Sequence, residues 1–177
     1  MAKDMKTLLQ TAIQDTYSAE TQILKALPKM EQAAVTQSLK QAFREHRQET
    51  ERQVERLKEA AKMLSLKPEG ETCEAMEGLV EEAEEHIQKL QQGPVLDAAL
   101  IGAAQKVEHY EIAAYGTITA MLKAMGEQKA ADLMAQTLKE EKDTDERLTM
   151  LAEQEVNPAA LGQQAANDPS GRRTSAA

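Results

Sequence analysis

The chain has 177 residues, which is enough for one domain with its own hydrophobic core. Only 2% of the residues are aromatic, and the dominant Ala, Leu, Glu, Gln and Lys favour helices over strands. A formal net charge of -9 argues against nucleic acid and anionic membranes as partners, and no apolar run is long enough to span a membrane. The composition therefore predicts an all-α protein. Because the single cysteine, Cys73, cannot form an intrachain disulfide, we also expect the protein to be reduced and cytoplasmic.

Two long helices are predicted in the first part of the chain. The first runs from about residue 4 to residue 34, and Pro28 inside it predicts a kink or a short break. The second follows Ser38, which has capping-box spacing with Gln41, and continues to Leu64. The short connection between them predicts an antiparallel hairpin.

A shorter helix and a third long helix are predicted next. The turn-rich segment "SLKPEGET" (65–72) ends the first hairpin. The shorter helix is predicted over about 73–90. The third long helix begins at residues 93–94, a Gly-Pro pair that places proline at the first helical position. It ends at Gly126, a typical C-terminal cap.

The last predicted helix runs from about Gln128 to Gln154 and stops before the Asn-Pro pair at 157–158. The remaining tail, 157–177, is small and polar and is expected to be disordered, so the predicted domain covers 1–156. A link of about 30 residues between two helical hairpins is long enough to cross a bundle. The sequence therefore predicts a ferritin-like four-helix bundle with a short fifth helix in the crossover.

Ionisable residues fall on the apolar stripe of all four long helices when each residue is rotated by about 100°. Four of them lie near the centre of a stripe and two, Glu49 and Glu108, lie at an edge. Buried carboxylates without partners are costly and repel one another. Two divalent cations would neutralise four carboxylates and could take a neutral histidine as a nitrogen ligand. The predicted metal ligands are Glu20, His46, Glu49, Glu108, Glu111 and Glu141.

Four further residues are candidates for supporting roles at this site. Tyr17 and Tyr115 lie one turn from predicted ligands, where they would pack or donate a hydrogen bond to a ligand carboxylate. His109 lies off the apolar stripe, so we expect it to be solvated, with a role as an alternative ligand left open. Asp145 lies off-centre beside Glu141.

Two simpler interpretations compete with a metal site. A helix whose phase is misjudged would place its glutamate on the surface. Alternatively, the inward carboxylates would belong to a buried ion-pair network with Arg44, Arg47 or Lys106. These basic residues, however, project away from the apolar stripes.

Four segments resemble the stress-associated YciF-type ferritin-like proteins of bacteria. They are "DTYSAETQILKALPKM" (15–30), "FREHRQETERQVERL" (43–57), "CEAMEGL" (73–79) and "AAQKVEHYEIAAYGT" (103–117). The resemblance covers about residues 5 to 155. It implies a ferritin-like bundle, a homodimer and a di-metal site like that of rubrerythrin, with iron or manganese as the metal.

The ligand pattern departs in part from the wider ferritin-like pattern of one Glu on each of two helices and Glu-x-x-His on each of the other two. Glu20 matches the first helix, and Glu108-x-x-Glu111 resembles the rubrerythrin variant. The second helix carries His46-x-x-Glu49 in reverse order, and no histidine follows Glu141. One nitrogen ligand in place of two makes manganese, or a single metal ion, more plausible.

Three functions remain open at this point. One is a di-metal oxidoreductase that consumes peroxide or oxygen during stress. It would need an external redox partner, because the chain has no Cys-x-x-Cys pair. The second is a non-enzymatic structural or metal-binding stress protein whose acidic core holds one metal or none. The third is an interaction module that uses the acidic helical surface.

Overall fold

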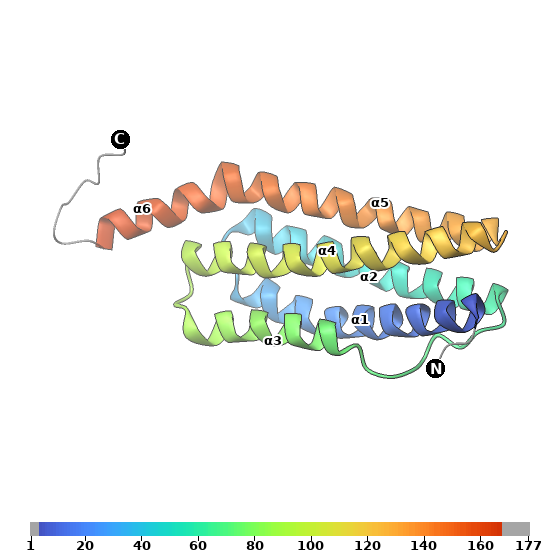
Figure 1. The fold of residues 1–177 in the computed structure, drawn as a ribbon. Coiled ribbons are helices and arrows are strands. Elements are labelled where there is room, and N and C mark those ends of the chain that lie inside the picture. The colour runs from blue at the N-terminus through green and yellow to red at the C-terminus, as the bar shows by residue number, and fades with distance from the viewer. Residues whose placement is uncertain (1–3, 168–177) are drawn as a thin grey trace.

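The computed structural model describes residues 4–167, with side chains as far as residue 162, and all regular secondary structure in this part of the chain is helical. Helices α1 and α2 form one antiparallel hairpin and α4 and α5 form the second; α1 packs on α4, and α2 packs on α5 (Figure 1). The predicted four-helix bundle is therefore confirmed. The bounds of the long helices are Met5–Ala33 (α1), Gln37–Met63 (α2), Pro94–Ala124 (α4) and Gln128–Leu151 (α5).

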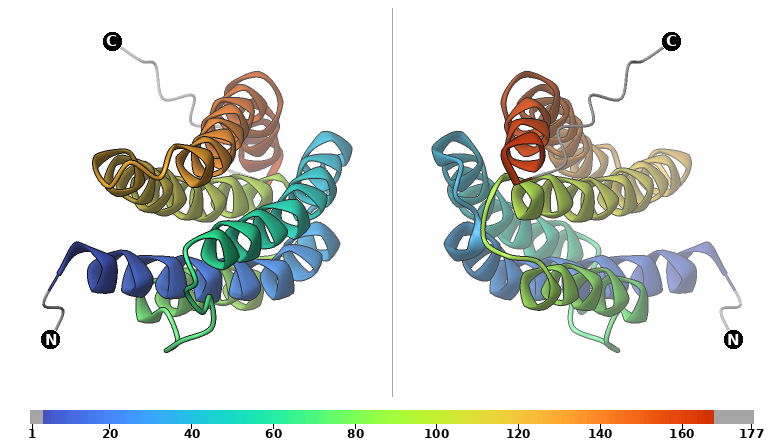
Figure 2. Two further views of the ribbon diagram at one scale, coloured as in Figure 1. Left: turned by 90° about the vertical axis from the view of Figure 1, so that its right-hand side faces the viewer. Right: turned by 90° about the vertical axis from the view of Figure 1, so that its left-hand side faces the viewer.

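The crossover between the hairpins contains the predicted short helix, α3, at Glu74–Lys89. Cys73 occupies its N-cap position. Helix α3 packs against α1 and α4 on the outside of the bundle, where Figure 2 shows it beside α1. Among the described residues, no helix is long and apolar enough to cross a membrane.

Proline and glycine fix the ends of α4. Pro94 opens the helix after Gly93, and Gly126 follows its end with a φ of 78°, a left-handed conformation that glycine adopts without strain. Both predictions are confirmed. Pro28, in contrast, lies inside α1 without interrupting it, so the short break, one of the two outcomes expected there beside a kink, does not occur.

The start of α2 differs from the prediction. Its N-cap is Thr36 rather than Ser38, whose hydroxyl donates instead to Glu155. The backbone N–H groups of Val35 and Thr36 donate to the buried carboxylate of Asp97 on α4, at 2.9 and 2.8 Å. A residue distant in sequence thus supplies the acceptors that a capping box would supply locally.

The predicted end of the last helix is also wrong. Helix α5 continues through a π-helical turn, Ala152–Val156, into a further helix, α6, at Asn157–Asn167. The ring of Pro158 would crowd the carbonyl four residues earlier in a regular helix. A π turn widens the helix at this point, with the Asn157 N–H bonded to the Ala152 carbonyl. Residues 157–167 are therefore helical, while 168–177 lie outside the described residues.

The hydrophobic core is divided into two clusters along the bundle. One cluster, which we call the α3 core, lies at the end covered by α3. The other, the turn core, lies toward Gly126 and the N-terminus of α1. The α3 core includes Leu27, Met30, Phe43, Leu96, Leu100 and Leu148, and the turn core includes Leu9, Ile13, Leu57, Leu122, Ala130 and Met134.

Candidate metal centre

A layer of buried polar residues lies between the two cores. It receives side chains from all four long helices, and each of them is at most 4% exposed. We call this set the carboxylate cluster: Glu20 from α1, His46 from α2, Glu108 and Glu111 from α4, and Glu141 from α5. The predicted inward phase of these residues is confirmed, so the interpretation as surface glutamates on misjudged helices is wrong.

Most of the cluster converges on one point. The possible ligand atoms of four members, all except Glu20, lie within 4.8 Å of one another. Within this group, His46 Nε2 lies 3.3 Å from Glu108 Oε1. Glu20 joins the cluster beside Tyr115, whose hydroxyl donates a hydrogen bond to Glu20 Oε1. This geometry matches what a small, highly charged cation requires.

Many polar atoms of the cluster have no hydrogen-bond partner among the described residues. They are Glu20 Oε2, both ring nitrogens of His46, Glu108 Oε2, and both carboxylate oxygens of Glu111 and Glu141. Buried polar atoms in folded proteins are nearly always paired, and an unpaired buried charge is costly. The donor set, rich in oxygen with one imidazole, fits a divalent cation such as manganese or iron.

The electrostatics of the cluster are those of uncompensated negative charge. Burial, followed by the neighbouring carboxylates, raises the pKa of Glu111 and of Glu141 well above the usual range. Burial also raises the pKa of Glu20 to about 7, although Tyr115 opposes the shift. Burial alone would lower the pKa of His46, but the charge of Glu108 and its neighbours leaves it raised.

Comparison with protein families identifies the family to which this chain belongs. The model of a family described as "Domain of unknown function (DUF892)" matches residues 4–161. The chain belongs to the DUF892 family. The protein YciF of Escherichia coli is 48% identical over 161 residues, which cover 89% of this chain and 97% of YciF. The resemblance inferred from the sequence segments is thus confirmed.

Solved structures support the same assignment. The E. coli stress protein YciF matches with a TM-score of 0.85 and 47% identity, covering 88% of this chain and 99% of that one. YcfI from Rhodopseudomonas palustris, described as a candidate structural protein, matches with a TM-score of 0.79 and 41% identity over 83% of this chain and 94% of its own. A Xanthomonas campestris protein matches with a TM-score of 0.75 but 20% identity, covering 91% of this chain and 99% of its own, which shows the fold alone.

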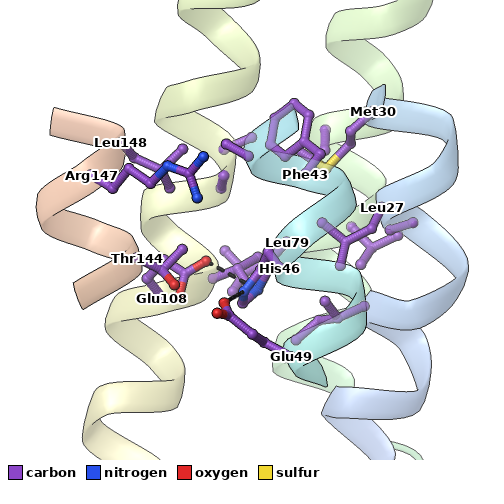
Figure 3. A pocket seen from close by; sticks show the side chains of 18 residues that line it. Leu27, Met30, Phe43, His46, Glu49, Leu79, Glu108, Thr144, Arg147 and Leu148 are labelled. Carbon is purple, nitrogen blue, oxygen red and sulfur yellow. Dashed lines mark ion pairs between the residues drawn. The ribbon is translucent and has the colours of Figure 1, made fainter. Parts of the chain in front are cut away.

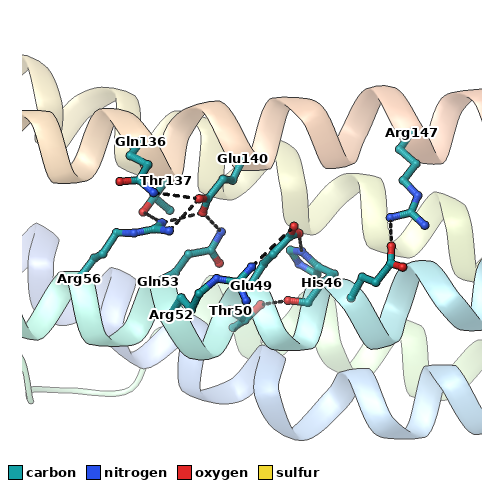
Figure 4. Close-up of polar contacts among 11 residues, drawn as sticks. His46, Glu49, Thr50, Arg52, Gln53, Arg56, Gln136, Thr137, Glu140 and Arg147 are labelled. Carbon is teal, nitrogen blue, oxygen red and sulfur yellow. Dashed lines mark hydrogen bonds and ion pairs between the residues drawn. The ribbon is translucent and has the colours of Figure 1, made fainter.

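In this DUF892 chain, Glu49 lies at the rim of the cluster, as its edge position predicts. Its side chain is 34% exposed, and its Oε2 lies 3.9 Å from His46 Nδ1 (Figure 4). A carboxylate orients a histidine ring when it accepts a hydrogen bond from the second ring nitrogen, and 3.9 Å is too long for such a bond. Glu49 therefore faces His46 without bonding to it, and its role as a direct ligand stays a prediction.

The supporting residues divide into one that reaches the cluster and three that do not. Tyr115 is fully buried and bonds to Glu20. Tyr17 packs beside the turn core. His109 is 69% exposed and lies 3.5 Å from Asp145, which also accepts a hydrogen bond from Gln105. His109 is therefore solvated, as expected, and Asp145 has its partners outside the cluster. Burial raises the pKa of Glu108, the charge of His46 lowers it, and the charge of Asp145 adds to the increase.

The predicted alternative of a buried ion-pair network is wrong. Arg44, Arg47 and Lys106 are each about half exposed, as their projection off the apolar stripes predicted. Their carboxylate partners are Glu31, Glu51 and Glu82 respectively. None of these contacts neutralises the carboxylate cluster.

A different ion pair lies close to the cluster and was not predicted. Arg56 on α2 binds Glu140 on α5 through two hydrogen bonds of 2.6 and 2.7 Å, and it also donates to Thr137 (Figure 4). The amide of Gln53 donates to the same glutamate at 3.2 Å. The sequence places Arg56 seven residues after Glu49 and so on the same helix face, but it does not indicate which residue of α5 Arg56 meets.

Proposed function

We propose that the carboxylate cluster binds two divalent ions, iron or manganese, and that the protein is a ferritin-like stress-response protein that consumes peroxide or oxygen. The observation that carries the proposal is the set of buried, unpaired oxygens on Glu108, Glu111 and Glu141. With Glu20, they form four carboxylates whose charge two divalent ions would balance. The similarity to the E. coli stress protein supports the physiological context.

The chain's own residues have separate tasks in this proposal. The carboxylates of Glu108, Glu111 and Glu141 hold the ions, and His46 is the neutral nitrogen ligand. Glu49 faces the imidazole from the rim of the cluster, and the hydroxyl of Tyr115 positions Glu20. Bound iron or manganese would supply the redox chemistry that these side chains lack.

Turnover would require electrons from outside the chain. A single cysteine provides no Cys-x-x-Cys pair, so we infer an external redox partner and, from the same residue, a cytoplasmic location. We further infer a homodimer. Light scattering at micromolar protein concentration should give twice the 19.5 kDa chain mass, and a monomer mass would contradict this inference.

Metal analysis of protein purified without chelator tests the proposal most directly. We expect two ions of iron or manganese per chain, and anaerobic calorimetric titration of metal-free protein should give the same stoichiometry. One ion per chain would contradict the di-metal assignment, and no ion would overturn the proposal. Consumption of peroxide or oxygen by the loaded protein, with an artificial reductant, then tests turnover.

A second candidate function is a non-enzymatic structural or interaction protein that holds one metal or none. The presence of a single imidazole in the cluster favours it, because ferritin-like oxidoreductases with the Glu-x-x-His pattern carry two histidines. The description of the Rhodopseudomonas palustris relative also agrees with it. Metal binding without measurable consumption of peroxide or oxygen would favour this candidate.

A further inference from the structure

An apolar cavity of about 30 Å³ lies directly against the carboxylate cluster, on the side of the α3 core. His46, Glu49 and Glu108 gather at one end of it, and Met30 and Phe43 lie at the other (Figure 3). Apart from Thr144 and Arg147, the rest of the lining is aliphatic and includes Leu27, Ala42, Ala104 and Leu148.

The size and polarity of the cavity select its occupant. A buried water needs two to four polar partners, and cavities lined by aliphatic side chains stay dry. An engineered cavity of roughly 150 Å³ is needed to bind benzene, so the volume of about 30 Å³ admits only a much smaller molecule. Hydrogen peroxide carries two O–H groups that the aliphatic part of the lining cannot satisfy, so it would be held only at the polar end beside His46 and Glu108, whereas dioxygen needs no hydrogen-bond partner anywhere in the cavity.

The lining of the cavity includes partly exposed residues on α2 and α5. Glu49 and Arg147 belong to its lining, and their side chains are 34% and 41% exposed. Arg147 forms an ion pair with Glu45, which links the two helices beside this opening. A small apolar molecule inside the cavity would meet the cluster at His46 and Glu108.

We propose that this cavity binds dioxygen and presents it to the carboxylate cluster, so that oxygen rather than peroxide is the oxidant. What happens to the dioxygen afterwards rests on the proposed function. Binding in the cavity does not, because the lining that holds the molecule is present without metal. The two ideas can therefore fail separately.

The first test uses metal-free protein with labelled methyl groups, observed by NMR under dioxygen pressure. Dioxygen is paramagnetic, so methyl groups close to a bound molecule relax faster. We expect a larger effect at Leu27 and Leu148, which line the cavity, than at Leu57 and Leu122 in the turn core, although all four are almost fully buried. Equal enhancement at all four methyl positions would overturn the proposal.

A pair of matched variants sharpens the test. Ala104→Val adds two methyl groups to the cavity lining, whereas Ala130→Val makes the same change in the turn core. Ala104→Val should abolish the enhancement at Leu27 and Leu148, and Ala130→Val should leave it. Ala42→Val, which fills the cavity from α2, provides a second blocking variant in case the first does not fold.

A kinetic comparison distinguishes the oxidants. In ferrous-loaded protein, Ala104→Val should slow oxidation by dioxygen about tenfold, because a close-packed interior leaves no alternative volume for the gas. The same variant should leave oxidation by hydrogen peroxide unchanged. An equal loss with both oxidants would overturn the assignment to dioxygen. If the protein binds no metal, the proposed function fails, but the NMR result still decides whether dioxygen occupies the cavity.

Discussion

Glu140 and Glu141 are neighbours on α5, yet the fold treats their carboxylates in opposite ways. Both terminal nitrogens of Arg56 donate hydrogen bonds to Glu140. Partial burial raises the pKa of Glu140, but the contacts with Arg56 and its neighbours outweigh burial and leave the pKa lowered. Glu141 is fully buried, neither of its oxygens has a hydrogen-bond partner among the described residues, and its pKa is raised well above the usual range, chiefly by burial. The fold supplies a counter-ion for the carboxylate of Glu140 and none, among the described residues, for that of Glu141.

The largest expected contrast is in the response to metal. At a free metal concentration of 100 times Kd, binding should stabilise the wild-type fold by about 2.7 kcal/mol. Glu141→Ala removes a proposed ligand, so the Kd should rise at least about tenfold, which corresponds to 1.4 kcal/mol. Glu140→Ala should retain the wild-type Kd. Thermal unfolding with and without Mn²⁺ or Fe²⁺, together with calorimetric titration, measures both quantities.

Without metal, Glu141→Ala should have the opposite effect on the stability of the fold. Glu141→Ala relieves repulsion and desolvation in the carboxylate cluster, so the metal-free protein should be equally or more stable. If metal-free Glu141→Ala is strongly destabilised, the residue instead belongs to a structural network. An equal gain in stability from metal in wild type and Glu141→Ala would also contradict its role as a ligand.

The second prediction concerns pH. The raised pKa values of Glu20, Glu111 and Glu141 mean that the folded, metal-free protein binds more protons than the unfolded chain above about pH 4.5. Burial lowers the pKa of His46 and the charge of Glu108 raises it, and because the net shift is upward, His46 also binds protons more tightly in the folded state. The stability that His46 contributes is present below about pH 6.5 and is lost as pH rises through its folded-state pKa.

The free energy of unfolding of metal-free protein should therefore fall between pH 5 and pH 7, by about 1.4 kcal/mol per pH unit for each extra proton bound by the folded state. Urea titrations at fixed pH measure this slope. Saturating metal should reduce it, because ligands bind metal in their deprotonated form. A metal-free protein that becomes more stable over this range would show that the carboxylate cluster does not control its stability.

The third prediction concerns the neutralised carboxylate. Arg56→Met leaves Glu140 partly buried without its charge partner, so the fold should lose about 2 kcal/mol. Metal affinity should not change, because the partners of Arg56 among the described residues are Thr137 and Glu140, which lie outside the carboxylate cluster. Replacing both partners, in Arg56→Met with Glu140→Leu, should restore part of the stability. Chemical denaturation checks all three proteins, and no recovery in the double variant would argue against the ion pair as the cause.

The smallest expected effect is at Tyr115. Tyr115→Phe removes the hydroxyl that donates to Glu20, and the metal-free protein should lose about 1 kcal/mol. Tyr17→Phe is the control, because Tyr17 packs at the turn core on the same bundle. Equal losses in the two variants, measured by urea denaturation, would assign the effect to packing rather than to the hydrogen bond.

The inward position of the carboxylate cluster was predictable because helix rotation fixes the direction of each side chain. Once the apolar stripes are phased, Glu20, Glu111 and Glu141 can point only to the interior. The end of the last helix was less predictable, because a proline ends a helix only if its ring clashes with the carbonyl four residues earlier. The π turn before Pro158 displaces that carbonyl, and nothing in local composition indicates it.

Contacts between helices account for the rest of what sequence did not reveal. The pairing of Arg56 with Glu140 depends on the relative register of α2 and α5, which periodicity within one helix does not determine. The cavity beside the cluster depends on how several small side chains meet, among them Ala26, Ala42 and Ala104. Packing density is a property of the assembled core and cannot be derived from any one helix.

The bond of Asp97 to the Val35 and Thr36 backbone has a mechanical consequence. It ties the connection between α1 and α2 to the first turn of α4, so the two hairpins are fastened to each other at that end. On the turn-core side of the carboxylate cluster, Arg56 on α2 binds Thr137 and Glu140 on α5 and so joins the hairpins a second time. Separation of the hairpins therefore requires both the Asp97 bonds and the Arg56–Glu140 pair to break, in addition to the loss of apolar packing between them.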